Sequence, residues 1–356
     1  MKATTGAGGE AVISPESSLQ AQMGKIFGYL KGLHATHLIN IGVKLGLFER
    51  LAQGPASPVD LAADLRLHSD YVQIWCQTAC ALELLDFEPE SGYLLAPQME
   101  ILLAQPAATF YLGGFPEAHL QVARDYERYP ELFKRGAVFP YQEHDEPFLR
   151  SVAGATRSLP RMFIDAVLPS LPALKDRLAS GATVLDLGCG AGHAVVEFAR
   201  RFPGVRCIGI DVEPTSVRMA AELVREQGLD NRVAVHQVTG DDWPVPDESV
   251  DLITTFLVLH EIEPHLKDAV IARCVRALRP RGELLIFDER YPSNAVGLRD
   301  PVQIYAVMAQ WYEVTWGNVI DTGEDILSLV HRHGLEVTGE TELSRFYVLL
   351  AAKRPY

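Results

Sequence analysis

Short hydrophobic runs alternate with amphipathic stretches through the second half of this 356-residue chain. Apolar runs bounded by Gly, Asp or Pro predict buried strands, and the segments between them have helical spacing. Strand and helix in alternation are typical of an α/β fold with a doubly wound, Rossmann-like sheet. The last two strands flank the short link TELSRF and are expected to pair antiparallel at the sheet edge. Seven strands are expected, near Thr183, Cys207, Val233, Leu252, Glu283, Glu336 and Tyr347.

Helical spacing dominates the segment from Gly32 to Gly92. It reads INIGVKLGLFERLA, then SPVDLAADL, then YVQIWCQTACALELLDF, and ends with YLLAP. This pattern predicts three helices followed by a short hairpin, which is the plan of a winged helix. Residues 110–178 are also largely helical by period, so a mostly α region is expected before the sheet.

Four segments follow from these patterns. Residues 1–18 are rich in Gly, Ser, Thr and Ala and are expected to form a flexible leader. We expect a winged-helix domain over 19–104, a helical linker over 105–178 and the sheet domain over 179–356. The length of the chain agrees with this division, because it exceeds what one hydrophobic core usually holds.

The run VLDLGCGAGH, from Val184 to His193, places a carboxylate and three glycines where a strand turns into a helix. Glycines let the backbone turn tightly and approach a ligand. A dinucleotide fingerprint G-x-G-x-x-G would need its third glycine at the position of His193, so the fit is poor. Asp186 would repel a pyrophosphate but attract an ammonium group, such as the one in S-adenosylmethionine.

Two further strand ends complete a site for that molecule. Asp211, followed by Val212, is placed to accept hydrogen bonds from ribose hydroxyls. The third strand leads into a carboxylate-rich turn with an aromatic residue, suited to an adenine ring and its amino group. That turn consists of Gly240, Asp241, Asp242 and Trp243.

The motifs VLDLGCGAGH, GIDV, GDDW and VDLITTFLVLHEI, in this order, resemble those of class I S-adenosylmethionine-dependent methyltransferases. The resemblance extends over about Leu171 to Tyr356 and implies that the chain is an enzyme. It places the cofactor against Gly188, Cys189, Gly190, Gly192, Thr255 and Phe256, in addition to the strand-end residues named above. Cys189 is expected to fill space beneath the cofactor, because no base lies near it in the sequence.

The chemistry is expected after the fourth strand, where TTFLVLHEIEPH contains His260 and Glu261. Similar plant-type O-methyltransferases have a His followed by an acid here, and the resemblance implies that His260 is the base. The alternative is a His that packs under the cofactor loop. An additional acid is expected to hold the base, either Glu313 or Glu289, while Glu261 either orients the ring or caps the next helix.

The acceptor is expected to lie under an aromatic cover. Residues 290–319 exceed a plain strand-to-helix link, and in similar enzymes the helices of 110–178 form the roof of the active site. The aromatic residues of 290–319 are also compatible with the core of an extra helix or with a dimer contact. The candidate lining residues are Tyr141, Met162, Tyr305, Met308, Trp311 and Tyr312, with His144, Arg161 and Phe163 as further candidates.

These observations predict methyl transfer to a hydroxyl of an aromatic or enolic small molecule, of the kind found in secondary metabolism. Transfer to carbon or nitrogen, for example of a keto acid or an indole, is the alternative. A winged-helix transcriptional regulator that binds S-adenosylmethionine is a third possibility. The resemblance also implies that the winged helix serves to form a homodimer.

Composition restricts the partners and the compartment. The net charge of −14, and the absence of Lys and Arg from Leu67 to Met99, argue against nucleic acid. No apolar run is long enough to span a bilayer, so no membrane is expected. The five cysteines contain no C-x-x-C, which favours a reducing cytoplasm. No metal is expected, because His260 and His265 are spaced five apart and Pro264 interrupts the helix.

Overall fold

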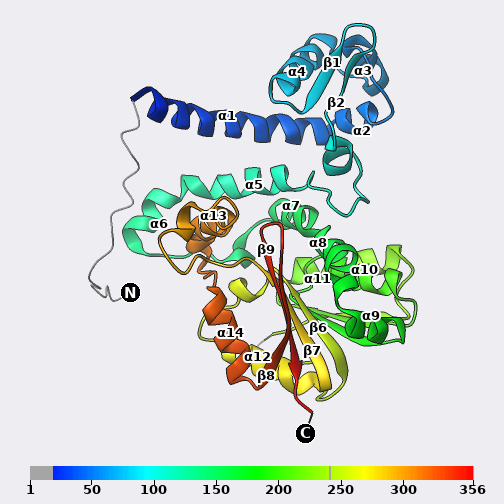
Figure 1. Ribbon diagram of the computed structural model, residues 1–356, viewed down its shortest axis with the longest axis vertical. Coiled ribbons are helices and arrows are strands. Elements are labelled where there is room, and N and C mark those ends of the chain that lie inside the picture. Colours follow the sequence, from blue (N-terminus) through cyan, green and yellow to red (C-terminus); the bar gives the residue numbers. More distant parts are fainter. Residues whose placement is uncertain (1–18, 240–241, 356) are drawn as a thin grey trace. The chain divides into compact units, whose positions relative to one another are not determined.

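The computed structural model describes residues 19–239 and 242–355, and the chain divides into two compact units between Ala96 and Pro97 (Figure 1). The expected leader, residues 1–18, lies outside the described residues. The expected domain boundary after residue 104 falls inside the second unit, where the N–H of Leu112 donates to the carbonyl of Leu102. The expected linker is part of the same unit as the sheet.

The first unit contains helices and one hairpin, in the predicted order. Trp75 packs edge-on against Phe48, with ring centroids 5.3 Å apart, and donates its indole N–H to the carbonyl of Leu38 at 3.1 Å. These contacts join three of the helices into one core. The elements are α1 (Leu19–Lys44), α2 (Leu47–Leu51), α3 (Pro58–Leu65), α4 (Ser69–Ala81), β1 (Leu85–Glu88) and β2 (Gly92–Leu95).

Two predicted helices of this unit have different bounds. INIGVKLGLFERLA is divided between α1 and α2, because Gly46 adopts a left-handed backbone with a φ of 72°. The third helix ends at Ala81, and Glu83 turns the chain with a φ of 59°. The residues LDF, expected to continue that helix, pair with β2 instead. Burial of Leu85 against the core favours the strand over the helical period.

The seven-stranded sheet of the second unit confirms the predicted fold class. Its order is β5-β4-β3-β6-β7-β9-β8; the first five strands in this order are parallel, and β9 pairs antiparallel with both β7 and β8. The strands are β3 (Thr183–Leu187), β4 (Arg206–Asp211), β5 (Val233–Gln237), β6 (Val250–Phe256), β7 (Leu278–Asp288), β8 (Leu335–Leu343) and β9 (Phe346–Lys353).

Helices cover both faces of this sheet (Figure 1). Alternate residues of β3 face opposite sides, so Val184 lies in the core with Phe198, whereas Leu185 lies in the core with Ile271. One face packs against α8 (Leu159–Met162), α9 (Pro172–Ala179), α10 (His193–Arg201) and α11 (Pro214–Glu226). The other face packs against α12 (Lys267–Ala277) and α14 (Gly323–Arg332).

The remaining helices lie over the carboxyl ends of the parallel strands. Residues of these helices border the same cavities as Gly188 and His260, which places them above the sheet edge where α/β folds bind ligands. They are α5 (Phe115–Val122), α7 (Glu146–Thr156) and α13 (Ile304–Glu313). The neighbouring α6 (Tyr129–Arg135) contacts α13 instead, where the hydroxyl of Tyr129 donates to the carbonyl of Tyr312 at 2.8 Å.

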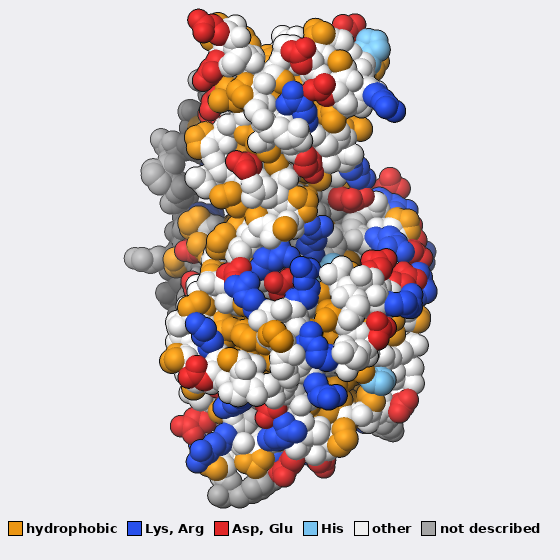
Figure 2. Space-filling model, turned by 90° about the vertical axis from the view of Figure 1, so that its right-hand side faces the viewer, with side chains coloured by type: hydrophobic (Ala, Val, Ile, Leu, Met, Phe, Trp, Pro, Cys, Tyr) orange, Lys and Arg blue, Asp and Glu red, His pale blue; other side chains and the backbone are white. Residues whose placement is uncertain are grey.

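Surface charge of both signs is mixed in the second unit. Figure 2 shows basic side chains near the middle of the face that it draws, with acidic side chains among them. Ion pairs also place opposite charges side by side on the surface, such as Arg218 and Glu146, whose nitrogen and oxygen atoms are 2.7 Å apart. The drawn face therefore has no region of one sign large enough to follow a phosphate backbone.

Candidate active site

Two connected chambers lie over the ends of β3, β4 and β6. The first follows the glycine turn after β3 and holds about 490 Å³, part of it open solvent; we call it the glycine chamber. The second extends to His260 and holds about 1080 Å³, part of it open solvent; we call it the carboxylate chamber. The two share walls that include Tyr141, Gly190 and Phe256.

The glycine turn depends on left-handed backbone. Gly188 has a φ of 66°, and a Cβ there would lie 2.6 Å from Val258. Gly190 has a φ of 51°, but a Cβ there would meet nothing within 4 Å and would project into open space. The N–H of Gly190 donates to Asp211 at 2.8 Å, which holds the turn against β4. The turn is thus rigid, with room for a ligand at its centre.

Two carboxylates flank this turn. Asp186 is buried and accepts a hydrogen bond from the hydroxyl of Thr254 at 2.7 Å, and burial raises its pKa to about 7. Burial also raises the pKa of Asp211, although the N–H groups of Glu213 and Gly190 donate to it. The contacts described for these two carboxylates include no cationic side chain, which suits a ligand with ammonium and sulfonium groups.

The other residues predicted to bind the cofactor have varied positions. Thr255 is fully buried and donates to the carbonyl of Leu285 at 3.3 Å; the parallel register places Thr254 beside Asp186 instead. Gly192 caps α10, and Trp243 packs partly against the core. Asp242 is exposed, and Gly240 and Asp241 lie outside the described residues. The predicted residues that border the chambers are Gly188, Cys189, Gly190, Val212 and Phe256.

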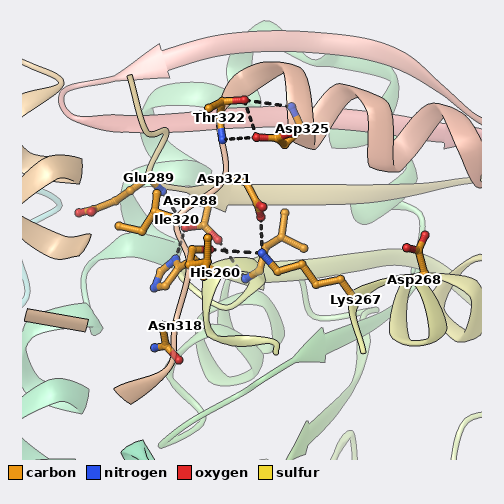
Figure 3. Close-up of polar contacts among 12 residues, drawn as sticks. His260, Lys267, Asp268, Asp288, Glu289, Asn318, Ile320, Asp321, Thr322 and Asp325 are labelled. Atoms are coloured by element: carbon orange, nitrogen blue, oxygen red, sulfur yellow. Dashed lines mark hydrogen bonds and ion pairs between the residues drawn. The ribbon is translucent and has the colours of Figure 1, made fainter. Parts of the chain in front are cut away.

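His260 lies at the floor of the carboxylate chamber between two carboxylates. Its Nδ1 makes a very short contact with Asp288, and its Nε2 lies 3.3 Å from Glu313. Burial alone lowers the pKa of His260, but Asp288 and Glu313 outweigh burial and hold this pKa well above its usual range. Figure 3 shows the ring of His260 turned toward Asp288, which projects from the end of β7. The two carboxylates therefore favour the imidazolium form of the ring.

Glu313 and Glu261 complete the group around His260. Glu313 is buried and accepts a hydrogen bond from the amide of Asn318 at 3.1 Å, and burial raises its pKa. Glu261 opens into the chamber, where its carboxylate still meets water. The enclosing walls, and then the carboxylates of Glu313 and Asp211, raise the pKa of Glu261 to about 8 against the opposing effect of His260. The chamber holds more negative than positive groups.

Asp288 is a functional candidate that sequence reasoning missed. The expected partners of His260 were Glu313 or Glu289, and the structure places Asp288 on Nδ1 with Glu313 on the other nitrogen. Asp288 also accepts the N–H of Leu259 at 3.0 Å and so fixes the turn that carries His260. The contact depends on the register of β6 and β7, in which Phe256 pairs with Phe287 and brings the ends of the two strands side by side.

Asp125 is a second missed residue, and it supports the chamber wall. Its carboxylate lies 2.7 Å from Nε2 of His144 and accepts the indole N–H of Trp316 at 2.9 Å. His144 stacks on Phe148, and Tyr141 packs edge-on against both Phe148 and Trp316. His144 is thus a support for Tyr141, whose ring borders both chambers.

The predicted lining residues divide between chamber, core and surface. Tyr141 and Tyr312 border the carboxylate chamber. Met162 lies in the hydrophobic core instead, because α8 packs directly on the sheet. The side chains of Tyr305, Met308 and Trp311 on α13 are 47%, 54% and 50% exposed. Trp311 packs on Tyr129, with the ring centroids 5.3 Å apart, and Arg345 lies over the ring of Tyr305.

The segment after α13 returns beside His260. The N–H of Val319 donates to the carbonyl of His260 at 3.2 Å. Lys267 donates to the carbonyl of Val319 at 3.3 Å and makes an ion pair with Asp321, as Figure 3 shows. These contacts fasten the end of the predicted lid to the floor of the chamber.

Among residues 19–239 and 242–355, no group of three or more His, Cys, Asp and Glu side chains is arranged to hold a metal ion. No helix in the described part of the chain is both long and apolar enough to cross a bilayer.

Comparison with known proteins agrees with this geometry. Residues 184–282 match the family model described as a methyltransferase domain. The chain is 32% identical over 139 residues to the uncharacterized methyltransferase YcgJ of Bacillus subtilis, an alignment that covers 36% of this chain and 53% of that protein. It is 26% identical over 282 residues to the N,N-dimethyltransferase OxyT of Streptomyces rimosus, covering 75% of this chain and 78% of that protein. The chain thus spans about half the length of the first of these relatives.

A solved structure extends the match to nearly the whole chain. A putative O-methyltransferase from Nostoc punctiforme has a TM-score of 0.72 and 18% identity, over 96% of this chain and 100% of that one. At this identity the likeness establishes the fold. The glycine turn, the strand order and the matched family model agree with one another. Residues 184–282 are thus similar to a methyltransferase domain, and the chain has the fold of the protein from Nostoc punctiforme.

Proposed function

We propose that this protein transfers a methyl group from S-adenosylmethionine to a hydroxyl of an aromatic or enolic small molecule. The observation that carries the proposal is the connection between the chambers: the glycine turn opens past Tyr141 and Phe256 to the group around His260. A donor in one chamber and an acceptor in the other can thus meet without water between them.

The glycine chamber fits the donor. Asp186 and Asp211 would hold its positively charged groups and its ribose, and the open space at Gly190 lets the backbone approach it. The cofactor, when bound, supplies an electrophilic methyl group. Cys189 is a buried thiol whose pKa is raised well above its usual value, mainly by burial, so it acts as filling and not as a nucleophile.

The carboxylate chamber receives the acceptor and its proton. Because His260 already holds a proton between Asp288 and Glu313, the acceptor hydroxyl releases its proton to the pair of Glu313 and His260 acting together. Asp288 fixes the ring of His260, and Tyr141 and Tyr312 orient a flat acceptor. The base that we predicted as His260 alone is, in this proposal, the pair.

The test combines binding with turnover. Calorimetry should detect binding of S-adenosylhomocysteine. Mass spectrometry should detect methyl transfer to members of a panel of phenols and enols. Tight binding of NADH, with no heat from S-adenosylhomocysteine, would contradict the donor assignment. Binding without turnover on any hydroxyl acceptor would contradict the acceptor assignment.

Transfer to nitrogen is the second candidate. One observation favours it: the similarity to OxyT, named an N,N-dimethyltransferase. An amine that binds unprotonated needs less help from His260 than a hydroxyl does. If His260→Ala retained most of the activity toward the true acceptor, nitrogen would be the better assignment.

We further propose that the protein is a cytoplasmic homodimer. Apolar side chains on several sides of α1, among them Leu19, Phe27 and Leu30, are 78%, 62% and 49% exposed. Such exposure on a 26-residue helix is typical of a surface covered by a partner. Light scattering at micromolar concentration should give twice the chain mass, and Phe27→Lys with Leu30→Lys should give the monomer.

We propose no binding to nucleic acid. The helix that a winged-helix reader would place in the groove, α4, contains Asp70 and neither Lys nor Arg. Salt-dependent gel shifts with duplex DNA should therefore be absent, and their appearance at low salt would favour the regulator.

A further inference from the structure

Glu289 holds an unsatisfied oxygen at the wall of the carboxylate chamber. Its side chain is only 4% exposed, yet it borders the chamber. Among the described residues, no group donates a hydrogen bond to Oε2, while Oε1 lies 3.4 Å from Arg345. A buried carboxylate oxygen without a donor is rare in folded proteins and needs an explanation.

Glu283 provides the comparison, because it is a buried glutamate of the neighbouring β7. Its Oε2 also lacks a hydrogen bond, but it lies 3.2 Å from Arg177, which compensates its charge. Arg345 lies beside Oε1 of Glu289 instead, and Oε2 receives no hydrogen bond from the described residues. The difference is that Glu289 faces an open chamber, where a ligand can supply the missing partner.

The charges around Glu289 indicate the sign of that partner. Glu261, Glu289 and Glu313 border the chamber and Asp288 lies behind them, whereas the described cationic groups beside them are the His260 imidazolium and Arg345. Burial raises the pKa of Glu289 to about 7, against the opposing effects of Arg345 and His260. A cation bound beside Glu289 would favour the charged form of its carboxylate against this effect of burial.

We propose that the acceptor carries a basic nitrogen, bound as an ammonium group at Oε2 of Glu289. This inference rests on the proposed methyltransferase function and adds the charge of the substrate to it. The ammonium group donates to Glu289, and the aromatic part lies against Tyr312 and Trp316. The neighbouring Arg345 is already occupied, because it stacks on rings that include Phe346 and pairs with Oε1.

Matched ligands test this inference by binding. We would use tyramine, 4-ethylphenol and 3-(4-hydroxyphenyl)propionate, which share a phenol and differ in charge, and a naphthol set with the same three side chains. Calorimetry in the presence of S-adenosylhomocysteine should give tighter binding for the cation than for its neutral twin, by about tenfold. The anion should bind most weakly in each set.

Two variants assign the effect to Glu289. Glu289→Gln keeps the shape, removes the charge and should remove most of the tenfold preference, with little change for the neutral ligand. It also frees Arg345, so the anion should bind more tightly than before. Glu283→Gln removes a similar buried glutamate away from the chamber, and it should retain the preference in full.

The outcomes separate this inference from the proposed function. Cations that bind no better than their neutral twins, or that do not bind while S-adenosylhomocysteine does, would overturn the inference and leave methyl transfer intact. A preference that survives Glu289→Gln would overturn the assignment to Glu289. Absence of heat from S-adenosylhomocysteine itself would overturn the proposed function and this inference with it.

Discussion

The glycine chamber and the carboxylate chamber are built in different ways. The first contains the turn residues between Asp186 and Ala194, and backbone N–H groups hold Asp211 next to that turn. The second is assembled from side chains of separate segments, and several of its carboxylates have raised pKa values. A site formed by backbone groups suits a ligand that is the same in every related protein. A site formed by side chains can change its specificity when those residues are substituted.

The largest effect is expected in the carboxylate chamber, from Asp288→Asn. This change removes the charge that holds His260 at Nδ1 and weakens the turn at Leu259. We expect kcat to fall by about 10²-fold to 10³-fold, as for other histidines that lose an orienting carboxylate. Initial rates of methyl transfer measure it, and the affinity for S-adenosylhomocysteine should be unchanged.

Asp268→Asn is the control for that comparison. Asp268 lies on α12 and pairs with Arg332 on the surface, and Figure 3 shows it apart from His260. Equal losses in the two variants would mean that Asp288 acts only through general stability.

Substitutions at two glycines of the turn should distinguish the space that the ligand occupies from the space that the protein core occupies. Gly190→Ala places a methyl group in open space and should weaken S-adenosylhomocysteine binding by about tenfold or more, with about 1 kcal/mol of backbone strain. Gly188→Ala forces the same group against Val258 and should cost about 1–3 kcal/mol of stability. Calorimetry measures the binding and urea denaturation measures the stability. If Gly188→Ala weakened binding and Gly190→Ala did not, the ligand would not lie beside Gly190.

Cofactor affinity should depend on pH through Asp186. Its pKa of about 7 means that the carboxylate loses its charge below neutral pH, so binding of an ammonium group should weaken by about tenfold per pH unit well below pH 7. Burial, then Arg157 and Arg161, lower the pKa of the neighbouring His193 to about 4, so it stays neutral across this range. Calorimetry of S-adenosylhomocysteine from pH 5.5 to 8 tests this, and Asp186→Asn should give a flat profile.

The smallest effect concerns the stability cost of Glu261. Because its pKa is raised from 4.5 to about 8, the free energy of unfolding should decrease as pH rises through that window. Glu261→Gln removes this cost and should be more stable than the parent at pH 8, by about 1 kcal/mol or less since water reaches the side chain. At pH 4 the two proteins should melt alike. Equal stability at pH 8 would show that the charge is well solvated.

The two chambers also differ in how well the sequence predicted them. VLDLGCGAGH is contiguous, so its strand, its turn and the position of Asp186 followed from spacing alone. The contact between Asp288 and His260 joins residues 28 positions apart and depends on the register of β6 and β7. Arg345 lies in the link TELSRF, which we read only as a hairpin. Contacts of this kind are set by tertiary packing.

Helical period predicted that 290–319 contains a helix but not which side faces inward. Tyr312 and Glu313 face the chamber, whereas Trp311 packs against Tyr129 on the outside. Neighbouring residues of a helix are about 100° apart, so the direction depends on which surface α13 meets, and composition does not specify that surface. Met162 was predicted to line the acceptor site, but it lies in the core because α8 packs on the sheet.

The fastening of Val319 to the backbone of His260 has a mechanical consequence. One end of the segment that carries Glu313 is fixed at the chamber floor, so an outward swing of α13 to admit an acceptor would pivot about that point. Such a swing would draw Glu313 away from the imidazole and interrupt the proton relay. We therefore expect the pair of Glu313 and His260 to accept a proton only while α13 lies over the chamber.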